Sequence, residues 1–444
     1  MNVVLISTYE LGRQPFGLAS PAAWLRERGH RVSQVDLALS PLPSLLIREA
    51  HLVCFHLPMH TATRLAAPIV ERVRLLNRDA QLCAYGLYAP LNAAYLQSLG
   101  VRHIIGGEFE PALADLAGAL EAGAPPLPQP LIPLDRIGWR TPDRDGLPAL
   151  SRYARLTVNG DRRTVGYTEA SRGCKHLCRH CPVVPVYQGQ FRVVPVETVL
   201  ADVRAQIEAG AQHITFGDPD FFNGPVHAIR IVERLRAEFP AATYDVTIKV
   251  EHLLNHRSLL PVLARTGCLF VTTAVESVDD RVLALLDKGH TRADFIEAVD
   301  VCAAAGLTLS PTFIPFTPWT TREGYCDLLS LIADLDLAEN VSPVQLALRL
   351  LVPATSRLLE LPEIQAVLGP FDSAALVWKW RHPDAGMDAL SGRLLRLVNA
   401  EQKARRSRRE IFERIWTEAH GAPPEDFRLL PRAAIPYLDE PWYC

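Results

Sequence analysis

The stretch that decides this fold reads Arg172-Gly173-Cys174-Lys175-His176-Leu177-Cys178-Arg179-His180-Cys181-Pro182. Its cysteines follow the spacing Cys-x3-Cys-x2-Cys, and no fourth cysteine lies nearby. Three thiolates can hold three corners of a cubic iron–sulfur cluster and leave the fourth iron free, much as catalytic zinc sites keep one open position. An electron carrier normally closes all four positions, so a three-cysteine loop indicates chemistry at the open iron.

The same cysteines also permit a zinc site, with His176 or His180 as the fourth ligand. The usual structural zinc pattern has two ligand pairs separated by a longer stretch, and no second pair follows here. Disulfides are disfavoured, because the chain has 9 cysteines, an odd number, and shows no signal peptide at its start. The cluster is the preferred interpretation and zinc the alternative.

Composition places the chain among globular proteins of several domains. Hydrophobic residues make up 48% and charged residues 21% of its 444 residues, which is typical of soluble proteins too long for one ordinary core. No apolar run approaches the ~20 residues that span a bilayer. A net charge of -3 gives no electrostatic footprint for nucleic acid or anionic membranes. We therefore expect a cytoplasmic protein that binds neither.

The first part of the chain, residues 1–123, alternates strand and helix signals. This alternation predicts a doubly wound, Rossmann-like parallel sheet, whose ligands bind at the carboxyl ends of the strands. The Pro-rich passage 124–160 is predicted to be a linker, because proline interrupts helices and sheets. The predicted strands of the first sheet are 2–7, 31–37, 51–56, 81–86 and 101–107.

Residues 161–360 repeat the alternation. Six strand–helix units, with the cysteine loop after the first strand, predict a partial (β/α)6 barrel of TIM type, with working residues at the carboxyl ends of its strands. The remainder, 361–444, is predicted to be mainly helical with a Pro-rich tail, which completes an α/β fold class. The predicted barrel strands are 167–169, 213–217, 244–250, 270–274, 308–314 and 344–349.

The cysteine loop, directly after the first barrel strand, resembles the signature of the radical S-adenosylmethionine (SAM) superfamily. The resemblance implies that Cys174, Cys178 and Cys181 hold a [4Fe–4S] cluster. It also implies that the unique iron binds the amino and carboxylate groups of SAM, whose sulfonium bond is cleaved after one-electron reduction. The residue before the third cysteine is usually aromatic and packs near adenine, a role that falls here to His180.

A second motif, Thr215-Phe216-Gly217-Asp218-Pro219-Asp220, lies at the end of the second barrel strand. It looks like the family motif that receives the methionine amino group of SAM. Phe216 and Gly217 belong to this motif, and Asp218 or Asp220 would supply the carboxylate that faces the ammonium. A turn with helix-capping aspartates is the alternative interpretation.

The segments 272–277 and 286–291 are similar to the fourth-strand region of cobalamin-associated and methylthiotransferase-like members. The resemblance implies that Glu276 lies at the carboxyl end of this strand, facing the cofactor, with a catalytic role. Lys249, at the end of the third strand, and Arg349, on the sixth, are predicted to contact the ribose or the carboxylate of SAM. Strand residues that merely fill the barrel interior are the alternative.

The amino-terminal domain resembles the cobalamin-binding modules fused to many radical SAM enzymes, through residues 18–25 and 106–111. The Asp-x-His-x-x-Gly signature that supplies a lower axial histidine to cobalt is absent after the first strand. Two interpretations stay open: the domain binds cobalamin without a protein imidazole as ligand, or it is a scaffold that holds no corrin. His56 and His60 follow the third strand, where solvated histidines are more common than ligands.

The segment 7–21, taken with the end Glu440-Pro441-Trp442-Tyr443-Cys444, resembles radical SAM proteins that carry a Cys-Cys or Cys-selenocysteine tail before Ala-Glu-Pro. Relatives of that group include the radical SAM enzyme of arsinothricin biosynthesis. The resemblance implies a catalytic Cys444, a native chain that continues through a selenocysteine codon, and a soft substrate such as arsenite. A frayed terminus is the alternative.

Together these features predict a radical SAM enzyme that cleaves SAM reductively, for group transfer or bond formation on a small molecule. A flavodoxin or ferredoxin is the expected reductant. The alternatives are 3-amino-3-carboxypropyl transfer from SAM to trivalent arsenic, cobalamin-dependent methyl transfer, and a non-enzymatic sensor built on a cluster or zinc.

Overall fold

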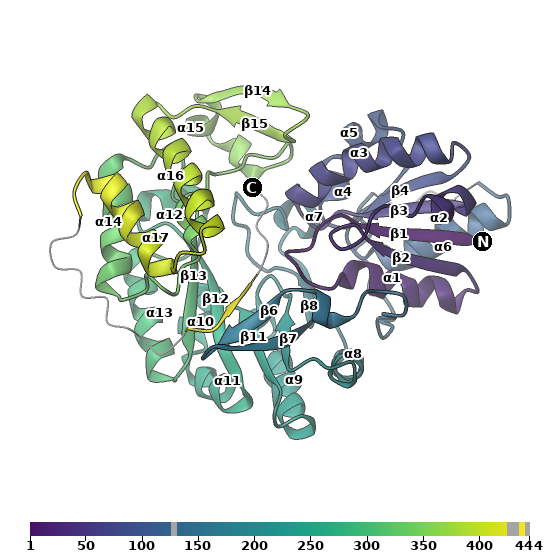
Figure 1. The fold of residues 1–444 in the computed structure, drawn as a ribbon, viewed down its shortest axis with the longest axis horizontal. Coiled ribbons are helices and arrows are strands. Elements are labelled where there is room, and N and C mark those ends of the chain that lie inside the picture. The colour runs from purple at the N-terminus through teal and green to yellow at the C-terminus, as the bar shows by residue number, and fades with distance from the viewer. Residues whose placement is uncertain (126–130, 424–434, 440–444) are drawn as a thin grey trace.

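Two sheets, one from each half of the chain, form the framework of the molecule (Figure 1). The structure is a computed structural model, in which residues 1–125, 131–423 and 435–439 are described. The α/β fold class predicted from the sequence is confirmed. Among the described helices, none is both long and apolar enough to cross a membrane.

The amino-terminal sheet is entirely parallel and has the strand order β2-β1-β3-β4-β5. This is the flavodoxin-like strand order. In such sheets the order of the strands reverses between β1 and β3, and ligands bind in the crevice at that point. The strands are β1 (Asn2–Ser7), β2 (Arg31–Asp36), β3 (Leu52–His56), β4 (Gln81–Tyr85) and β5 (His103–Ile105).

Successive residues of these strands serve two separate cores, because side chains alternate across a strand. Val4 and Ile6 pack on one face, and Val3 and Leu5 on the other. Strands that are buried on both faces appear in a sequence as continuous apolar runs, and these runs predicted the strands of this sheet. The larger helices of this half are α1 (Phe16–Glu27), α3 (His60–Leu76) and α6 (Phe109–Glu121); the shorter ones are α2 (Ser44–Glu49), α4 (Tyr88–Leu91) and α5 (Ala93–Ser98).

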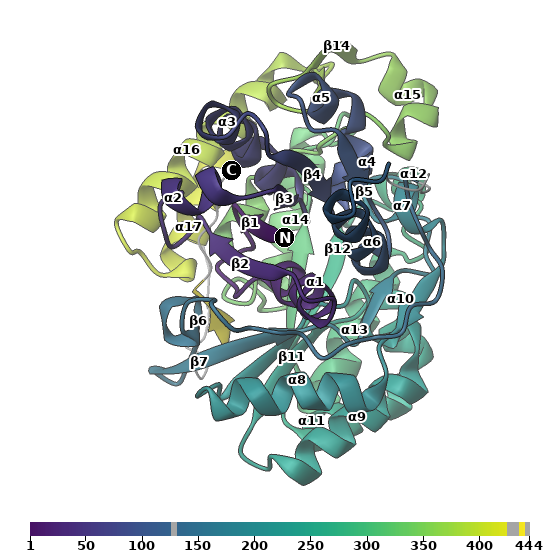
Figure 2. The ribbon, with the colours of Figure 1, turned by 90° about the vertical axis from the view of Figure 1, so that its right-hand side faces the viewer.

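The second sheet is a curled half-barrel with the order β13-β12-β11-β10-β7-β6-β16. The first five strands in this order are parallel, namely β7 (Asp161–Thr168), β10 (His213–Phe216), β11 (Thr243–Thr247), β12 (Cys268–Glu276) and β13 (Thr308–Phe313). Helices along its outer face include α8, α9 and α11 (Figure 2). Their bounds, with those of the neighbouring helices, are α8 (Val196–Glu208), α9 (Pro225–Glu238), α10 (Val250–Asn255), α11 (Leu260–Thr266), α12 (Asp280–Leu286), α13 (Arg292–Ala304) and α14 (Arg322–Asp334).

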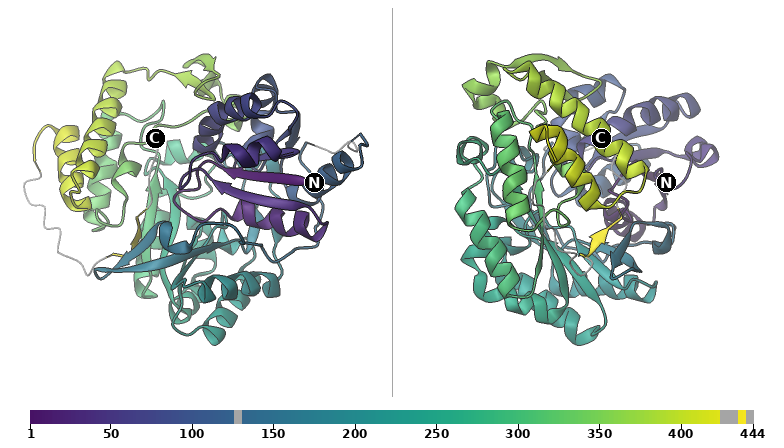
Figure 3. Two further views of the ribbon diagram at one scale, coloured as in Figure 1. Left: turned by 45° about the vertical axis from the view of Figure 1, so that its right-hand side comes forward. Right: turned by 60° about the vertical axis from the view of Figure 1, so that its left-hand side comes forward.

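The sixth barrel strand predicted at 344–349 does not form. Residues Pro343–Leu346 make a short 3-10 helix (η4), and only Arg349 forms a single parallel bridge, to Phe316. Pro343 has no N–H for a sheet ladder and suits the first turn of a helix. Helices α16 (Ala385–Lys403) and α17 (Arg408–His420) pack on η4 and close this edge of the sheet (Figure 3).

Besides a small hairpin at the cysteine loop, three strand pairs were not predicted from the sequence. β6 (Arg155–Val158) pairs with β7 across a tight turn in which Asn159 and Gly160 both have positive φ, 51° and 84°, the type I′ hairpin geometry. β16 (Tyr437–Leu438) adds to the free edge of β6. The carboxyl-terminal region, expected to be mainly helical, also contains the hairpin β14 (Leu368–Asp372) and β15 (Val377–Trp380).

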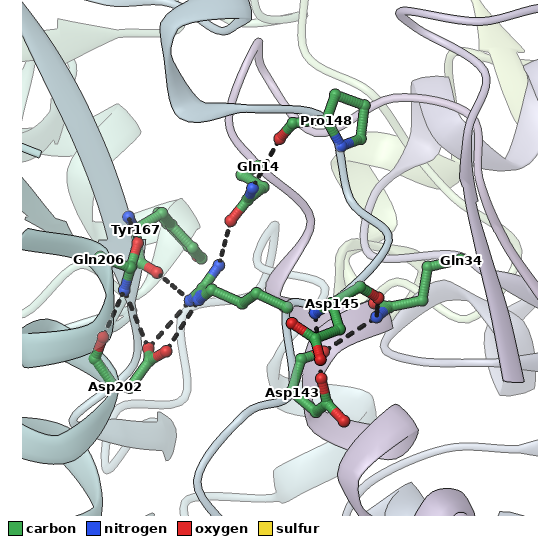
Figure 4. A network of polar contacts seen from close by, with 9 residues as sticks. Gln14, Gln34, Asp143, Asp145, Pro148, Tyr167, Asp202 and Gln206 are labelled. Carbon is green, nitrogen blue, oxygen red and sulfur yellow. Dashed lines mark hydrogen bonds and ion pairs between the residues drawn. The ribbon is translucent and has the colours of Figure 1, made fainter. Parts of the chain in front are cut away.

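A polar network ties the segment before β6 to both sheets (Figure 4). Arg144 donates to both carboxylate oxygens of Asp202 on α8, at 2.8 and 2.9 Å, and to the side-chain oxygen of Gln14 at 2.8 Å. Gln34 on β2 donates to the carbonyl oxygens of Asp143 and Asp145. The passage therefore connects the two halves rigidly through buried hydrogen bonds. The domain limits predicted from the sequence stay predictions.

Candidate active site

The cysteine loop leaves the barrel at the carboxyl end of β7 and is shaped by a small hairpin, β8 (Ser171–Gly173) with β9 (Phe191–Val193). Gly173 has φ 76°, and a Cβ there would meet the Gln190 carbonyl oxygen at 2.4 Å, so only glycine fits before Cys174. Cys178 is buried, and all three cysteines are free thiols. Burial raises the pKa of Cys174, and that of Cys181 to about 12. The raised pKa values of Cys174 and Cys181 mean that their thiols ionise more readily beside a cationic centre, which fits an iron–sulfur cluster.

The two candidate aspartates after β10 have different environments. Asp218 accepts hydrogen bonds from the Ala170 N–H at 2.9 Å and the Ser171 hydroxyl at 2.5 Å, one on each oxygen. Burial raises its pKa to about 7. It holds the start of the cysteine loop, and its role as a cofactor contact stays a prediction.

Asp220 is the aspartate that faces the cysteine loop. Its Oδ1 caps the short helix η2 (Phe221–Asn223) through the Phe222 N–H at 3.1 Å. Its Oδ2 lies 2.7 Å from His252 Nδ1 and 3.5 Å from His176 Nε2, without a well-directed hydrogen bond. Burial opposes ionisation of Asp220, but the two histidines lower its pKa, so the group is a carboxylate.

The other members of this motif do not offer polar contacts to a ligand. Phe216 is fully buried in the barrel core against Phe221 and Tyr244. Gly217 is required for packing, since a Cβ there would lie 1.8 Å from the Tyr167 hydroxyl oxygen. Their roles as cofactor contacts stay predictions.

Lys249, directly after β11, points into the same space. Its Nζ donates to His176 Nδ1 at 2.9 Å and lies 3.4 Å from Glu251 Oε2. His290, from the loop after α12, is buried beside Lys288 and Lys249 with neither ring nitrogen hydrogen-bonded. Burial and the two lysines lower its pKa to about 4. These groups extend the polar wall from the cysteine loop to the fourth strand.

Glu276 ends β12 in an unusual conformation, with φ 69° at a bulge in the β12–β13 pairing. A non-glycine residue with positive φ at a strand end is a common mark of a functional position. Its Oε1 lies 3.2 Å from His180 Nε2 and 3.4 Å from Lys288 Nζ. Burial alone would raise its pKa, but Lys288 and then His180 lower it to about 2. Glu276 and His180 thus form one polar unit beside the cysteines.

Arg349 has its described contacts away from this cluster. The Arg349 guanidinium pairs with Asp388 at 2.5 Å and lies over the Trp380 ring. Its described contacts therefore belong to the carboxyl-terminal region. Cys444 lies outside the described residues, which end at Asp439 beside β6.

The carboxyl edge of the amino-terminal sheet faces the cysteine loop across a cavity of about 230 Å³. Its lining combines Glu10, His56 and Gly107 with Arg172 and Tyr187 from the other half. His56 Nδ1 lies 2.7 Å from Glu10 Oε1, and the ring fills the space beside Gly17, where a Cβ would meet it at 1.9 Å.

Arg172, two residues before Cys174, closes this cavity on the loop side. It makes a bidentate pair with Glu110 at 2.7 and 2.9 Å and also contacts Glu169 and Glu108. Pockets for drug-sized ligands measure roughly 300–1,000 Å³, and a corrin is larger than such ligands. The cavity as it stands is smaller than a corrin needs, and cobalamin binding at this edge stays a prediction. His60, the other histidine after β3, contacts the Ala375 carbonyl oxygen.

The sequence did not identify His252, His290, Lys288 or the acidic partners of Arg172. Lys288 and His290 lie within a segment whose family likeness was visible, but nothing in it indicated their burial. His252 follows Lys249 by one helical turn in α10, a spacing that places both at the same strand end.

Comparison with known proteins identifies the part of the chain that carries this site. Residues 168–332 match the family model described as the radical SAM superfamily. The tRNA-2-methylthio-N(6)-dimethylallyladenosine synthase of Alkalilimnicola ehrlichii is 24% identical over 218 residues, 47% of this chain and 48% of that protein. The hopanoid C-3 methylase of Methylococcus capsulatus is 24% identical over 185 residues, 42% and 35% respectively. The chain spans about half the length, or less, of these curated relatives.

Solved structures with the same arrangement cover both sheets. OxsB, a cobalamin-dependent S-adenosylmethionine radical enzyme, superposes with a TM-score of 0.69 at 16% identity, over 88% of this chain and 65% of that chain. The radical S-adenosylmethionine methyltransferase TsrM from Kitasatospora setae gives 0.60 at 16% identity, over 76% and 70%. These likenesses concern the fold. The part of the chain from residue 168 to residue 332 therefore belongs to the radical SAM superfamily, whose fold implies a [4Fe–4S] cluster and SAM, as the sequence predicted.

Proposed function

We propose that this protein is a radical SAM enzyme that cleaves SAM reductively and transfers a group, or forms a bond, on a small molecule. One observation carries the proposal. Buried polar atoms without a well-directed hydrogen bond surround the three thiols, where a charged and hydroxylated cofactor would satisfy them. They are His176 Nε2, His180 Nδ1, Asp220 Oδ2, His252 Nδ1 and both ring nitrogens of His290.

In this proposal, each residue has a defined task. Cys174, Cys178 and Cys181 hold the cluster, which when bound supplies the electron that cleaves the sulfonium. Asp220 accepts a hydrogen bond from the amino group of SAM, and Lys249 donates one to its carboxylate. Glu276 accepts hydrogen bonds from the ribose hydroxyls, and the His180 ring stacks near adenine. The buried walls exclude water from the reacting centre.

The experiment is anaerobic reconstitution of the chain with iron and sulfide, reduction, and addition of SAM, with products followed by mass spectrometry. The expected result is cleavage of SAM that depends on Cys178. Release of 5′-deoxyadenosine would indicate ordinary radical chemistry. Release of 5′-methylthioadenosine with arsenite present would support 3-amino-3-carboxypropyl transfer to trivalent arsenic, for which Cys444 and a flavodoxin- or ferredoxin-type reductant stay predictions. A complete cluster without cleavage would contradict the enzyme and favour a sensor.

Cobalamin-dependent methyl transfer is the second candidate, favoured by the likeness of the whole two-sheet arrangement to OxsB and TsrM. The cavity of about 230 Å³ argues against it. Incubation with hydroxocobalamin followed by gel filtration decides the matter through visible absorption. We expect no corrin in the protein fraction. Stoichiometric retention of cobalamin would support the methyltransferase hypothesis instead.

A further inference from the structure

We propose that His176 and His252 are positioning residues, which hold Asp220 and Lys249 as a clamp for the amino-acid end of SAM. The proposal rests on the function proposed above. It gives His176 and His252 a task in binding SAM that a loss of activity alone would not reveal.

The clamp draws on three β–α loops. His176 lies in the cysteine loop after β7, Asp220 follows β10, and His252 lies in α10 after β11. The side chain of Asn223 fixes the first two loops together, because its Oδ1 accepts from the Lys175 N–H at 3.1 Å and its Nδ2 donates to the Gly173 carbonyl oxygen at 3.3 Å. The positions of the three side chains are therefore set by the backbone.

Hydrogen-bond chemistry fixes the state of the His176 ring. A lysine ammonium can only donate, so Nδ1 of His176, 2.9 Å from Lys249 Nζ, is an acceptor. The proton of a neutral ring is then on Nε2, which lies 3.5 Å from Asp220 Oδ2. His176 thus separates a fixed cation from a fixed anion by one imidazole ring.

His252 acts on the anion directly. A carboxylate can only accept, so the His252 Nδ1 at 2.7 Å carries a proton toward Asp220 Oδ2. The rings of His252 and His176 lie with centroids 4.7 Å apart, on either side of that oxygen. Together they keep the buried carboxylate oriented while one of its oxygens still lacks a well-directed hydrogen bond.

An anion and a cation one ring apart match the ammonium and carboxylate of an α-amino acid, with one hydrogen bond at each end. The seat lies next to the cluster loop, since the Cys174 thiol, a His176 ring nitrogen and an Asp220 oxygen are all within 4.8 Å of one another. On the far side, a Cβ at Gly289 would meet Glu251 Oε2 at 2.9 Å, so the loop before His290 closes tightly over Lys249 and Glu251.

The test compares two ligands on matched variants of the full chain with its cluster reconstituted. SAM carries the amino-acid end, and 5′-methylthioadenosine lacks it. Binding is measured by equilibrium dialysis, and by the change that SAM causes in the EPR spectrum of the reduced cluster. We expect His252→Phe to weaken SAM about tenfold or more, because the 2.7 Å contact that orients the Asp220 carboxylate is lost, and to leave 5′-methylthioadenosine unchanged.

Two further variants separate positioning from folding. His252→Asn keeps a donor near the position of Nδ1 and is expected to bind SAM within about threefold of the parent. His256→Phe changes the neighbouring histidine, whose ring lies 5.7 Å from that of His252, and is expected to bind both ligands normally. If His252→Phe loses the cluster, Lys249→Met applies the same comparison to the carboxylate end.

Several results would overturn the clamp. Unchanged SAM binding in His252→Phe would do so, as would equal weakening of both ligands. Stoichiometric zinc at the Cys174, His176 and Asp220 atoms would assign them to a metal. If SAM leaves the parent protein's spectrum unchanged, the proposed function itself fails, whereas a normal parent with an insensitive variant removes only the clamp.

Discussion

The two sheets present opposite kinds of carboxyl edge to one another. Facing the amino-terminal edge, three buried polar pairs form within the protein: His56 with Glu10, and, from the cysteine-loop side, Arg172 with Glu110 and Tyr187 with Glu108. At the barrel edge, His176, His252 and His290 surround a space without completing their hydrogen bonds. A native protein leaves few buried polar groups without a hydrogen bond. Groups of this kind therefore mark a place where a bound ligand is expected to supply the missing partners. The barrel edge is built for a cofactor, and the other edge is built as a closed wall.

The largest expected effect concerns the cysteines of the barrel edge, compared with a cysteine elsewhere in the same half. Cys178→Ala should reduce iron and sulfide after reconstitution to background, because two thiolates cannot hold a [4Fe–4S] cluster. Cys326→Ala, a half-buried cysteine on α14, should leave both unchanged. Metal analysis and visible absorption measure the result. Zinc in the parent protein in place of iron would break the comparison.

The next effect tests whether the amino-terminal edge is a closed wall. Arg172→Met leaves the buried Glu110 without its bidentate partner, and we expect the free energy of unfolding to fall by about 3–5 kcal/mol. Arg28→Met removes an exposed pair with Asp115 and should cost at most about 1 kcal/mol. Urea unfolding of both variants measures the difference. A loss no larger than that of Arg28→Met would show that the wall does not depend on Arg172.

The sequence predicted the parts of the fold that local pattern controls. Strands buried on both faces appeared as apolar runs, and the spacing of Cys174, Cys178 and Cys181 indicated the cluster loop. The turn at Asn159-Gly160 was equally visible and would have predicted the β6–β7 hairpin, since both residues accept positive φ. This turn fell within the segment 124–160, which its prolines predicted to be a linker.

Other features depended on contacts that no local pattern contains. The apolar run after Pro343 suits a strand or a buried helix, and its packing against α16 and α17 selects η4. Asp218 and Asp220 cannot be told apart by spacing, because only the partners Ser171 and His252 give them different environments. Residues joined across loops far apart in sequence become a site only when the barrel brings the strand ends together.

A smaller effect of opposite sign is expected at the barrel edge. His290 is buried with two unsatisfied ring nitrogens, so His290→Leu should raise the free energy of unfolding by about 1–2 kcal/mol in the absence of SAM. A site residue often costs stability in this way. His213→Leu provides the contrast, because its ring nitrogens contact Thr243 and Asp245 and its loss should destabilise. Destabilisation by His290→Leu would mean that the barrel edge is satisfied after all.

The smallest effect concerns pH and the wall. Burial raises the pKa of Glu108 from 4.5 to about 7 against the opposing effect of Arg172, so the folded chain holds a proton that the unfolded chain releases. Its contribution to stability is complete below about pH 4.5 and is lost as pH rises through about 7. Glu108→Gln removes this titration, and between pH 5.5 and 7.5 its free energy of unfolding should fall by about 2 kcal/mol less than that of the parent. The exposed Glu71→Gln should follow the parent curve. Parallel curves for the parent and Glu108→Gln would mean that Glu108 is ionised, and that the wall carries more negative charge than its single arginine balances.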